Sequence, residues 1–185
     1  MIQNLKTYKT PEHFRGRSAF IVQLWFIVYF IFFRPSPQFM YAWRRFLLRS
    51  FGAKVGEKVL IRPSAKVTYP WKVSIGEYSW IGDNAVLYSL GEIKIGNNTV
   101  ISQRCYLCTG SHKQEVPSFP IYSQKITIGS ECWLATDVYV APGTTINNAC
   151  VVGARSSVFN DLDWSSNDPA EITLTLSYDY AILEF

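Results

Sequence analysis

Aliphatic residues recur at every sixth position from Val55 onward. The recurrence advances by two residues instead of six in two places, and it resumes after a gap to continue until Val158. Its members are Val55, Ile61, Val67, Val73, Ile75, Ile81, Leu87, Ile93, Ile95, Ile101, Leu107, Ile128, Leu134, Val140, Ile146, Val152 and Val158. A period of six fits neither an amphipathic helix nor the long alternating strands of an up-and-down barrel. The pattern predicts a triangular solenoid of short strands whose aliphatic side chains point inward.

A second regularity supports the same geometry. The residue four positions after most of these aliphatics is small, as expected at the narrow corners of a coil: Ala65, Ser79, Ala85, Gly91, Thr99, Cys105, Ser111, Cys132, Thr144, Cys150 and Ser156. The segments VSI (73–75) and IKI (93–95) shift the phase, and ITI (126–128) restarts it. We therefore expect about three strands per coil, with coils stacked at roughly 4.8 Å.

The first 54 residues form a different kind of segment. Residues 19–33 are apolar except for Gln23, and Arg15, Arg17 and Arg34 flank them. The breaker RPSPQ follows, and then FMYAWRRFLLRSFG predicts a basic amphipathic helix that ends near Gly52. A spanning helix needs about 20 apolar residues, so the first stretch is short for that role. Three interpretations stay open for this arm: packing on the body or in an oligomer, contact with an anionic membrane surface, or membrane spanning.

Composition narrows the classes further. With 185 residues, 48% hydrophobic and 17% charged, the chain suits one ordered domain and excludes a disordered or collagen-like protein. The net charge of +4 divides into +8 for residues 1–54 and −4 for residues 55–185. The four cysteines show no CxxC pairing with histidines, and no secretory leader is evident. We expect reduced thiols in a cytoplasmic protein with no nucleic-acid partner.

Three stretches of the repeat region resemble a known family. IGEYSW-IGDNAV, IGNNTV-ISQRCY-LCTGSH and IGSECW-LATDVY-VAPGTT-INNACV-VGARSS resemble hexapeptide-repeat acyltransferases. Within that family, WRRFLLRSFGAKVG, YLCTGSH and ECWLATDVYVAPGTTI are most similar to colanic-acid-type acetyltransferases of bacterial exopolysaccharide synthesis. The resemblance implies an all-β domain over residues 55–163, a left-handed parallel β-helix. It also implies an N-terminal helical segment within 1–54 and a protruding loop at about 113–125.

His112 stands where the repeats stop. A histidine there could be structural, a metal ligand, a nucleophile or a general base. The only other histidine, His13, precedes the repeats, which argues against a metal site. The match of TGSH to the family's motif implies the fourth role, in which the imidazole removes a proton from a sugar hydroxyl.

The resemblance also implies an acetyl-CoA site without a metal. Trp133 is a capping aromatic on residue type alone; the family match makes it a cofactor contact, with an oxyanion donor and pantetheine contacts at Ala135 and Thr136. The match extends to Ala154. Relatives place an Asn or Asp one coil before the histidine to orient it, and the positions available here are Asp83, Asn84 and Ser89.

The resemblance ends near the C-terminus. Phe159 and Asn160 occupy the Thr-Lys positions that meet coenzyme A in the family, and residues 164–185 form a divergent tail. No Lys or Arg follows Arg155. We therefore expect coenzyme A to be held through pantetheine more than through its phosphates.

The sequence thus predicts an acetyl-CoA-dependent O-acetyltransferase for a sugar hydroxyl in exopolysaccharide synthesis. Its expected partners are a sugar or lipid-linked sugar and two further copies in a homotrimer, with peripheral contact at the inner face of the cytoplasmic membrane. The alternatives are an acetyltransferase for a soluble acceptor, such as an antibiotic or simple sugar, and a non-catalytic β-helix scaffold.

Overall fold

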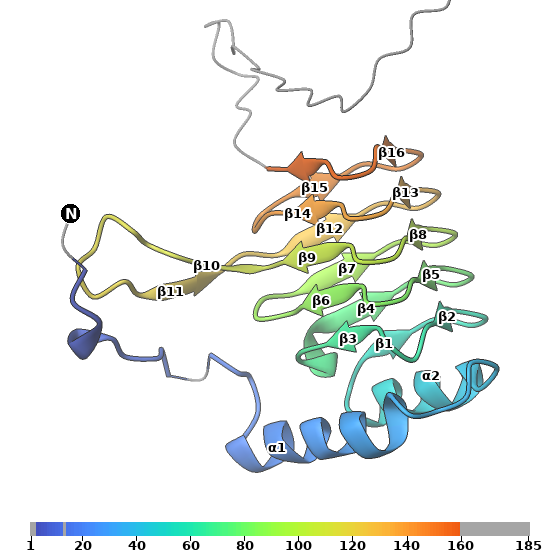
Figure 1. The fold of residues 1–185 in the computed structure, drawn as a ribbon, viewed down its shortest axis with the longest axis horizontal. Helices are drawn as coiled ribbons and strands as arrows, with labels where there is room; N and C mark the ends of the chain where they lie inside the picture. The colour runs from blue at the N-terminus through green and yellow to red at the C-terminus, as the bar shows by residue number, and fades with distance from the viewer. Residues whose placement is uncertain (1–2, 13, 160–185) are drawn as a thin grey trace, which may run out of the picture.

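The predicted parallel β-helix is confirmed. The computed structural model describes residues 3–12 and 14–159, so Asn160 and the tail at 164–185 lie outside the described residues. Three five-stranded parallel sheets form the sides of a triangular solenoid of about five coils (Figure 1). Within each coil the chain passes through sheet A, then sheet B, then sheet C.

The strands are short. Sheet A contains β1 (Lys54–Val55), β4 (Val73–Ile75), β7 (Ile93–Ile95), β12 (Ile126–Ile128) and β15 (Thr145–Ile146). Sheet B contains β2 (Leu60–Ile61), β5 (Trp80–Ile81), β8 (Val100–Ile101), β13 (Trp133–Leu134) and β16 (Val151–Val152). Sheet C contains β3 (Lys66–Val67), β6 (Val86–Tyr88), β9 (Tyr106–Cys108), β14 (Tyr139–Val140) and β17 (Ser157–Val158).

The six-residue recurrence marks the core. All of its members from Val55 to Ile146 are buried, and Val152 and Val158 are half-buried at the last coil. Corner residues such as Ala85, Thr99 and Cys105 are fully buried as well. The phase shifts coincide with the three-residue strands β4, β7 and β12, in which the first and third side chains both point inward.

The N-terminal arm closes the bottom of the solenoid (Figure 1). It contains a short 3-10 helix η1 (Leu5–Thr7), α1 (Ala19–Val28), a π-helical turn η2 (Tyr29–Phe33) and α2 (Tyr41–Ser50); a second 3-10 turn, η3 (Pro70–Lys72), follows β3. Trp25, Phe33 and Leu48 are fully buried in the same core cluster as the first coils. The arm therefore packs on the body. No described helix is both long and apolar enough to cross a membrane.

The loop after the third coil is more ordered than expected. The predicted loop at about 113–125 does protrude, and its base is an antiparallel hairpin of β10 (Gly110–His112) and β11 (Ile121–Ser123) (Figure 1). His112 pairs with Ile121 at its outer end. Antiparallel pairing satisfies backbone groups that a projecting irregular loop would leave to water.

Candidate active site

His112 is held by the tip of its own hairpin. Its Nδ1 lies 2.8 Å from the carbonyl oxygen of Phe119, and the Phe119 ring stacks on the imidazole with centroids 4.3 Å apart and an interplanar angle of 7°. A carbonyl oxygen only accepts hydrogen bonds, so Nδ1 carries the proton. In neutral His112 the lone pair is then on Nε2, the nitrogen that can accept a proton from a substrate.

The sequence did not single out Phe119. Its backbone adopts φ +50°, which is unusual for a residue other than glycine, and this turn points its carbonyl back at His112. No short motif signals such a turn before Pro120, so only the folded hairpin reveals the contact.

None of the three residues considered for orienting His112 contacts it within one chain. Ser89 is buried, and its hydroxyl accepts from the Tyr69 N–H at 2.8 Å and donates to the Tyr69 carbonyl at 3.0 Å. Its hydrogen bonds therefore fix the turn between coils. Asp83 and Asn84 lie at the corner between sheets B and C, whereas the hairpin leaves the corner between sheets C and A.

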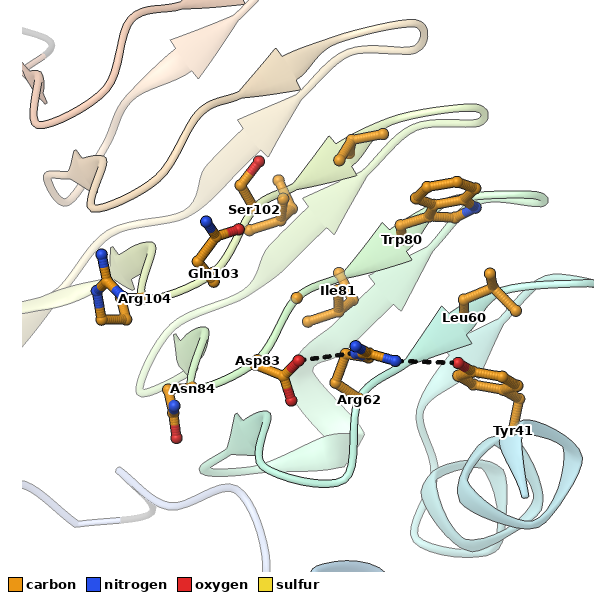
Figure 2. Close-up of a pocket in the computed structure, with 13 residues that line it drawn as sticks. Tyr41, Leu60, Arg62, Trp80, Ile81, Asp83, Asn84, Ser102, Gln103 and Arg104 are labelled. Atoms are coloured by element: carbon orange, nitrogen blue, oxygen red, sulfur yellow. Dashed lines mark hydrogen bonds and ion pairs between the residues drawn. The ribbon is translucent and has the colours of Figure 1, made fainter. Parts of the chain in front are cut away.

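Asp83 instead belongs to a cavity of about 530 Å³ on sheet B. Figure 2 shows Arg62 between Asp83 and Tyr41. The Arg62 Nε lies 2.8 Å from one Asp83 oxygen, and the Ser64 hydroxyl donates to the other at 2.7 Å. These two hydrogen bonds, first from Ser64 and then from Arg62, lower the pKa of Asp83, which stays ionised at neutral pH.

Three of the residues considered for acetyl-CoA, Ala135, Thr136 and Ala154, lie on adjacent coils at the corner between sheets B and C. Leu134 pairs with Val152, so Thr136 and Ala154 occupy equivalent places two residues later, and the Arg155 N–H donates to the Thr136 carbonyl at 2.9 Å. Trp133 is 51% exposed on sheet B, with its Nε1 donating to the Ser102 hydroxyl. Phe159 is exposed and packs near Tyr139.

The two candidate oxyanion donors differ. The Ala135 N–H donates to the Val152 carbonyl at 3.0 Å as part of the stacking between coils, so it is already used. The Thr136 N–H makes no backbone hydrogen bond within the described part of the chain. Thr136 is therefore the better donor of the pair.

Comparison with known proteins identifies relatives over nearly the whole chain. The colanic acid biosynthesis acetyltransferase WcaF of Escherichia coli K12 is 56% identical over 161 residues, covering 87% of this chain and 88% of WcaF. Among solved structures, a hexapeptide-repeat acetyltransferase from Vibrio cholerae complexed with acetyl-CoA superimposes with a TM-score of 0.69 at 23% identity, covering 78% of this chain and 80% of that one. A galactoside acetyltransferase in complex with coenzyme A gives 0.68 at 24% identity, covering 78% and 72%. No protein-family model matches the chain.

Proposed function

Because this chain belongs to the hexapeptide-repeat acetyltransferases, it is an acyltransferase that uses acetyl-CoA, and we propose that it acetylates a sugar hydroxyl in colanic-acid-like exopolysaccharide synthesis. The single observation that carries this proposal is the fixed tautomer of His112, because a base with a free Nε2 suits a hydroxyl acceptor. The name of the WcaF relative supports the polysaccharide context.

The proposed chemistry is a direct transfer. His112 Nε2 removes the proton of the acceptor hydroxyl while that oxygen attacks the thioester carbonyl of acetyl-CoA. The Thr136 N–H stabilises the negative charge on the carbonyl oxygen, an interaction usually worth about 3–4 kcal/mol. The intermediate then expels the thiolate of coenzyme A, which takes up the proton held by His112. The products are the acetyl ester and free coenzyme A.

The corner formed by Thr136 and Ala154 suits a pantetheine arm. Both residues are small, and they lie side by side on successive coils. Ala154 is exposed, while Thr136 is half-buried with its hydroxyl directed to the Gln103 carbonyl at 3.1 Å. A thin chain can lie along such a corner, beside the Arg104 guanidinium that donates to the Thr136 hydroxyl at 3.2 Å.

This arrangement requires more than one copy of the chain. Thr136 and Ala154 lie at the corner between sheets B and C, but the His112 hairpin leaves the corner between sheets C and A. The full width of sheet C separates the two groups within one chain, about 10 Å for a three-residue strand. We infer that His112 of one subunit faces Thr136 of the next, and that closure of this head-to-tail contact gives a homotrimer.

Sheet C carries a surface suited to that contact. The rings of Tyr88, Tyr106 and Tyr139 follow one another on its outer face, with centroid separations of 5.9 Å and 6.2 Å. All three side chains are half-buried in the isolated chain. Burial, with a further contribution from the Cys108 thiol, raises the pKa of Tyr139 to about 12, so this phenol stays neutral. A neutral aromatic stripe favours a subunit interface.

The proposal includes peripheral contact with an anionic membrane. The outer side of the arm exposes Phe20, Leu24, Ile27, Phe30, Ile31, Phe32, Phe39 and Phe46. Arg15, Arg17 and Arg34 are exposed beside it. An apolar face flanked by basic residues is typical of interfacial helices. Such contact suits an acceptor carried on a membrane lipid at the inner face of the cytoplasmic membrane.

Thiol release from acetyl-CoA tests the proposed activity. The wild-type protein is assayed with a panel of p-nitrophenyl glycosides, with lipid-linked sugars and with soluble amino-containing antibiotics. We expect release that depends on a sugar hydroxyl. Release with an antibiotic alone would favour the soluble-acceptor alternative, and no release above the protein-free rate with any acceptor would favour a scaffold.

A further inference from the structure

The N-terminal segment connects the His112 hairpin with α1 at the bottom of the solenoid (Figure 1). Residues 3–12 run beside β10 and β11 (Figure 1), and the Asn4 N–H donates to the Pro117 carbonyl in the hairpin loop at 2.7 Å. The other end of the segment is anchored by η3, where Lys72 Nζ donates to the Phe14 carbonyl and Trp71 Nε1 donates to the Arg15 carbonyl. The segment is thus fixed at both ends.

Tyr8 is the one residue between 3 and 12 that is not exposed. Its ring lies 6.2 Å from the His112 imidazole, tilted by 49°. One face of that imidazole is already covered by Phe119. Because Phe119 stacks face to face on the imidazole and Tyr8 is tilted to it, the two aromatic rings do not approach His112 in the same way.

The Tyr8 side chain is also partly withdrawn from solvent. Tyr8 is half-buried, and its charge is the last of the causes that raise the pKa of Tyr88, after burial, Cys108 and Tyr69. Aromatic rings therefore border His112 on the hairpin side and on the N-terminal side. A pyranose ring presents an apolar C–H face and a rim of hydroxyls, and it matches an aromatic face next to a phenol oxygen.

We propose that Tyr8 is an acceptor-binding residue that stacks on the pyranose ring of the acceptor and holds its hydroxyl at His112. The N-terminal segment positions Tyr8 beside the hairpin. The inference rests on the proposed sugar acetylation, and it assigns the acceptor side of that site to a segment outside the β-helix.

Steady-state kinetics with p-nitrophenyl β-D-galactopyranoside as the acceptor test this role. For Tyr8→Ala we expect the KM of the sugar to rise about tenfold, with the KM of acetyl-CoA unchanged. Tyr8→Phe keeps the ring and should stay within about threefold of the wild type. Lys9→Ala, at the next and exposed position, is the matched control and should not differ from the wild type. An unchanged sugar KM in Tyr8→Ala would overturn the proposal.

A second measurement does not depend on turnover. Diethyl pyrocarbonate modifies accessible histidines, and mass spectrometry resolves His112 from His13. We expect Tyr8→Ala to react faster at His112 than the wild type, and the galactoside to protect it about tenfold less well at a given concentration. Equal rates and equal protection in both proteins would contradict the placement of Tyr8. A wild-type enzyme that acetylates no sugar contradicts the proposed function instead, so the two failures are distinguishable.

Discussion

At the scale of single residues, the carbonyl of Phe119 sets the tautomer of His112. The hydrogen bond to the Phe119 carbonyl uses Nδ1 and leaves Nε2 available to a substrate. Stacking on Phe119 limits rotation of the ring. Many general-base histidines are oriented by a carboxylate, which also stabilises the protonated ring. In this chain a neutral carbonyl orients the ring instead of a carboxylate.

His112→Ala should abolish transfer without unfolding the protein. Loss of a general base typically costs about 10²–10⁴-fold in rate. The side chain is half-buried on a projecting hairpin, so the solenoid core does not depend on it. Thiol release gives the rate, and circular dichroism checks the fold. His13→Ala, the other histidine of the chain, is the control and should retain full activity. A well-folded His112→Ala enzyme with undiminished activity would rule out the base.

At the scale of elements, the arginines of α2 cap the first coil. The first coil of a solenoid has no coil beneath it, so its backbone carbonyls on that side have no hydrogen-bond donor from another coil. Arg44 Nε donates to the Ile61 carbonyl at 2.6 Å, Arg45 to the Val59 carbonyl at 2.9 Å, and Arg49 to the Val55 carbonyl at 2.8 Å and 2.6 Å. Several carbonyl acceptors of that open edge thus bind an arginine, and part of the positive charge of the arm stabilises the fold.

Arg44→Ala should destabilise the protein strongly. Arg44 is fully buried, and it also donates to the Ser36 hydroxyl and to the Pro37 and Gln38 carbonyls. Burial lowers its pKa, but the guanidinium stays protonated. Its removal leaves several buried acceptors unpaired, at about 1–3 kcal/mol each.

Urea unfolding at a fixed chain concentration measures the effect. We expect Arg44→Ala to lose at least about 3 kcal/mol of unfolding free energy, and Arg44→Lys to recover little, because an ammonium cannot reach four acceptors in different directions. Arg34→Ala, at an exposed position of the same arm, is the control and should change stability by less than about 0.5 kcal/mol. Equal midpoints for Arg44→Ala and Arg34→Ala would show that the capping is not needed.

The β-helix could be predicted because its sequence rule is steric. Only an aliphatic side chain fills the inner position of each strand, and only a small residue fits the corner, as at Ala85 and Cys105. The hairpin strand β11 could not be predicted, because Ile121–Ser123 is too short to show a period. The capping by α2 was missed for another reason. The sequence pattern shows that α2 is basic, but it does not show that its arginines lie within hydrogen-bonding distance of the carbonyls of the first coil.

The candidate site was predictable only in part, for a similar reason. His112, Thr136 and Ala154 stand in short motifs, so the resemblance to the family could assign their positions. The use of the Ala135 N–H by the Val152 carbonyl depends on which coils stack, and that register follows from the whole fold. Tyr8 carries no motif at all. Its approach to His112 depends on the path of a segment more than a hundred residues away in sequence.

At the scale of the whole molecule, a site shared between subunits predicts that two inactive variants can complement each other. His112→Ala should be inactive, and Ala154→Trp should be inactive because it fills the corner beside Thr136. Co-expression of the two variants should restore activity, because an interface can take His112 from one chain and Ala154 from the other.

Random assembly of equal amounts leaves about a quarter of the interfaces with both groups intact. We therefore expect the mixture to recover up to about a quarter of wild-type thiol release. Light scattering should give the mass of three chains for each protein. The control is a mixture made after separate purification without subunit exchange, which should stay inactive. Absence of recovery in co-expressed, trimeric protein would place the complete site within one chain.

The symmetry of the proposed trimer determines where the exposed apolar residues of the N-terminal arm lie. In the proposed trimer, an axis along the solenoid places the three arms at the same end, so the three apolar faces lie on one side of the assembly. A flat surface can meet all three at once, which multiplies a weak individual contact. Residues 1–50 cannot be deleted to test this, because Trp25 and Phe33 complete the core. Surface substitutions in the full chain avoid that problem.

We expect the full-length protein to float with vesicles of phosphatidylcholine and phosphatidylglycerol, and less so as salt rises. The triple variant Phe20→Ser, Ile27→Ser, Ile31→Ser removes side chains that are 73%, 53% and 58% exposed, so it should fold and yet lose at least about tenfold in partitioning. Tyr78→Ser with Val151→Ser, at exposed positions on the solenoid, is the control and should float normally. Equal flotation of the triple variant would contradict membrane contact; a wild-type mass of six chains that falls to three in the triple variant would show instead that two trimers cover these faces.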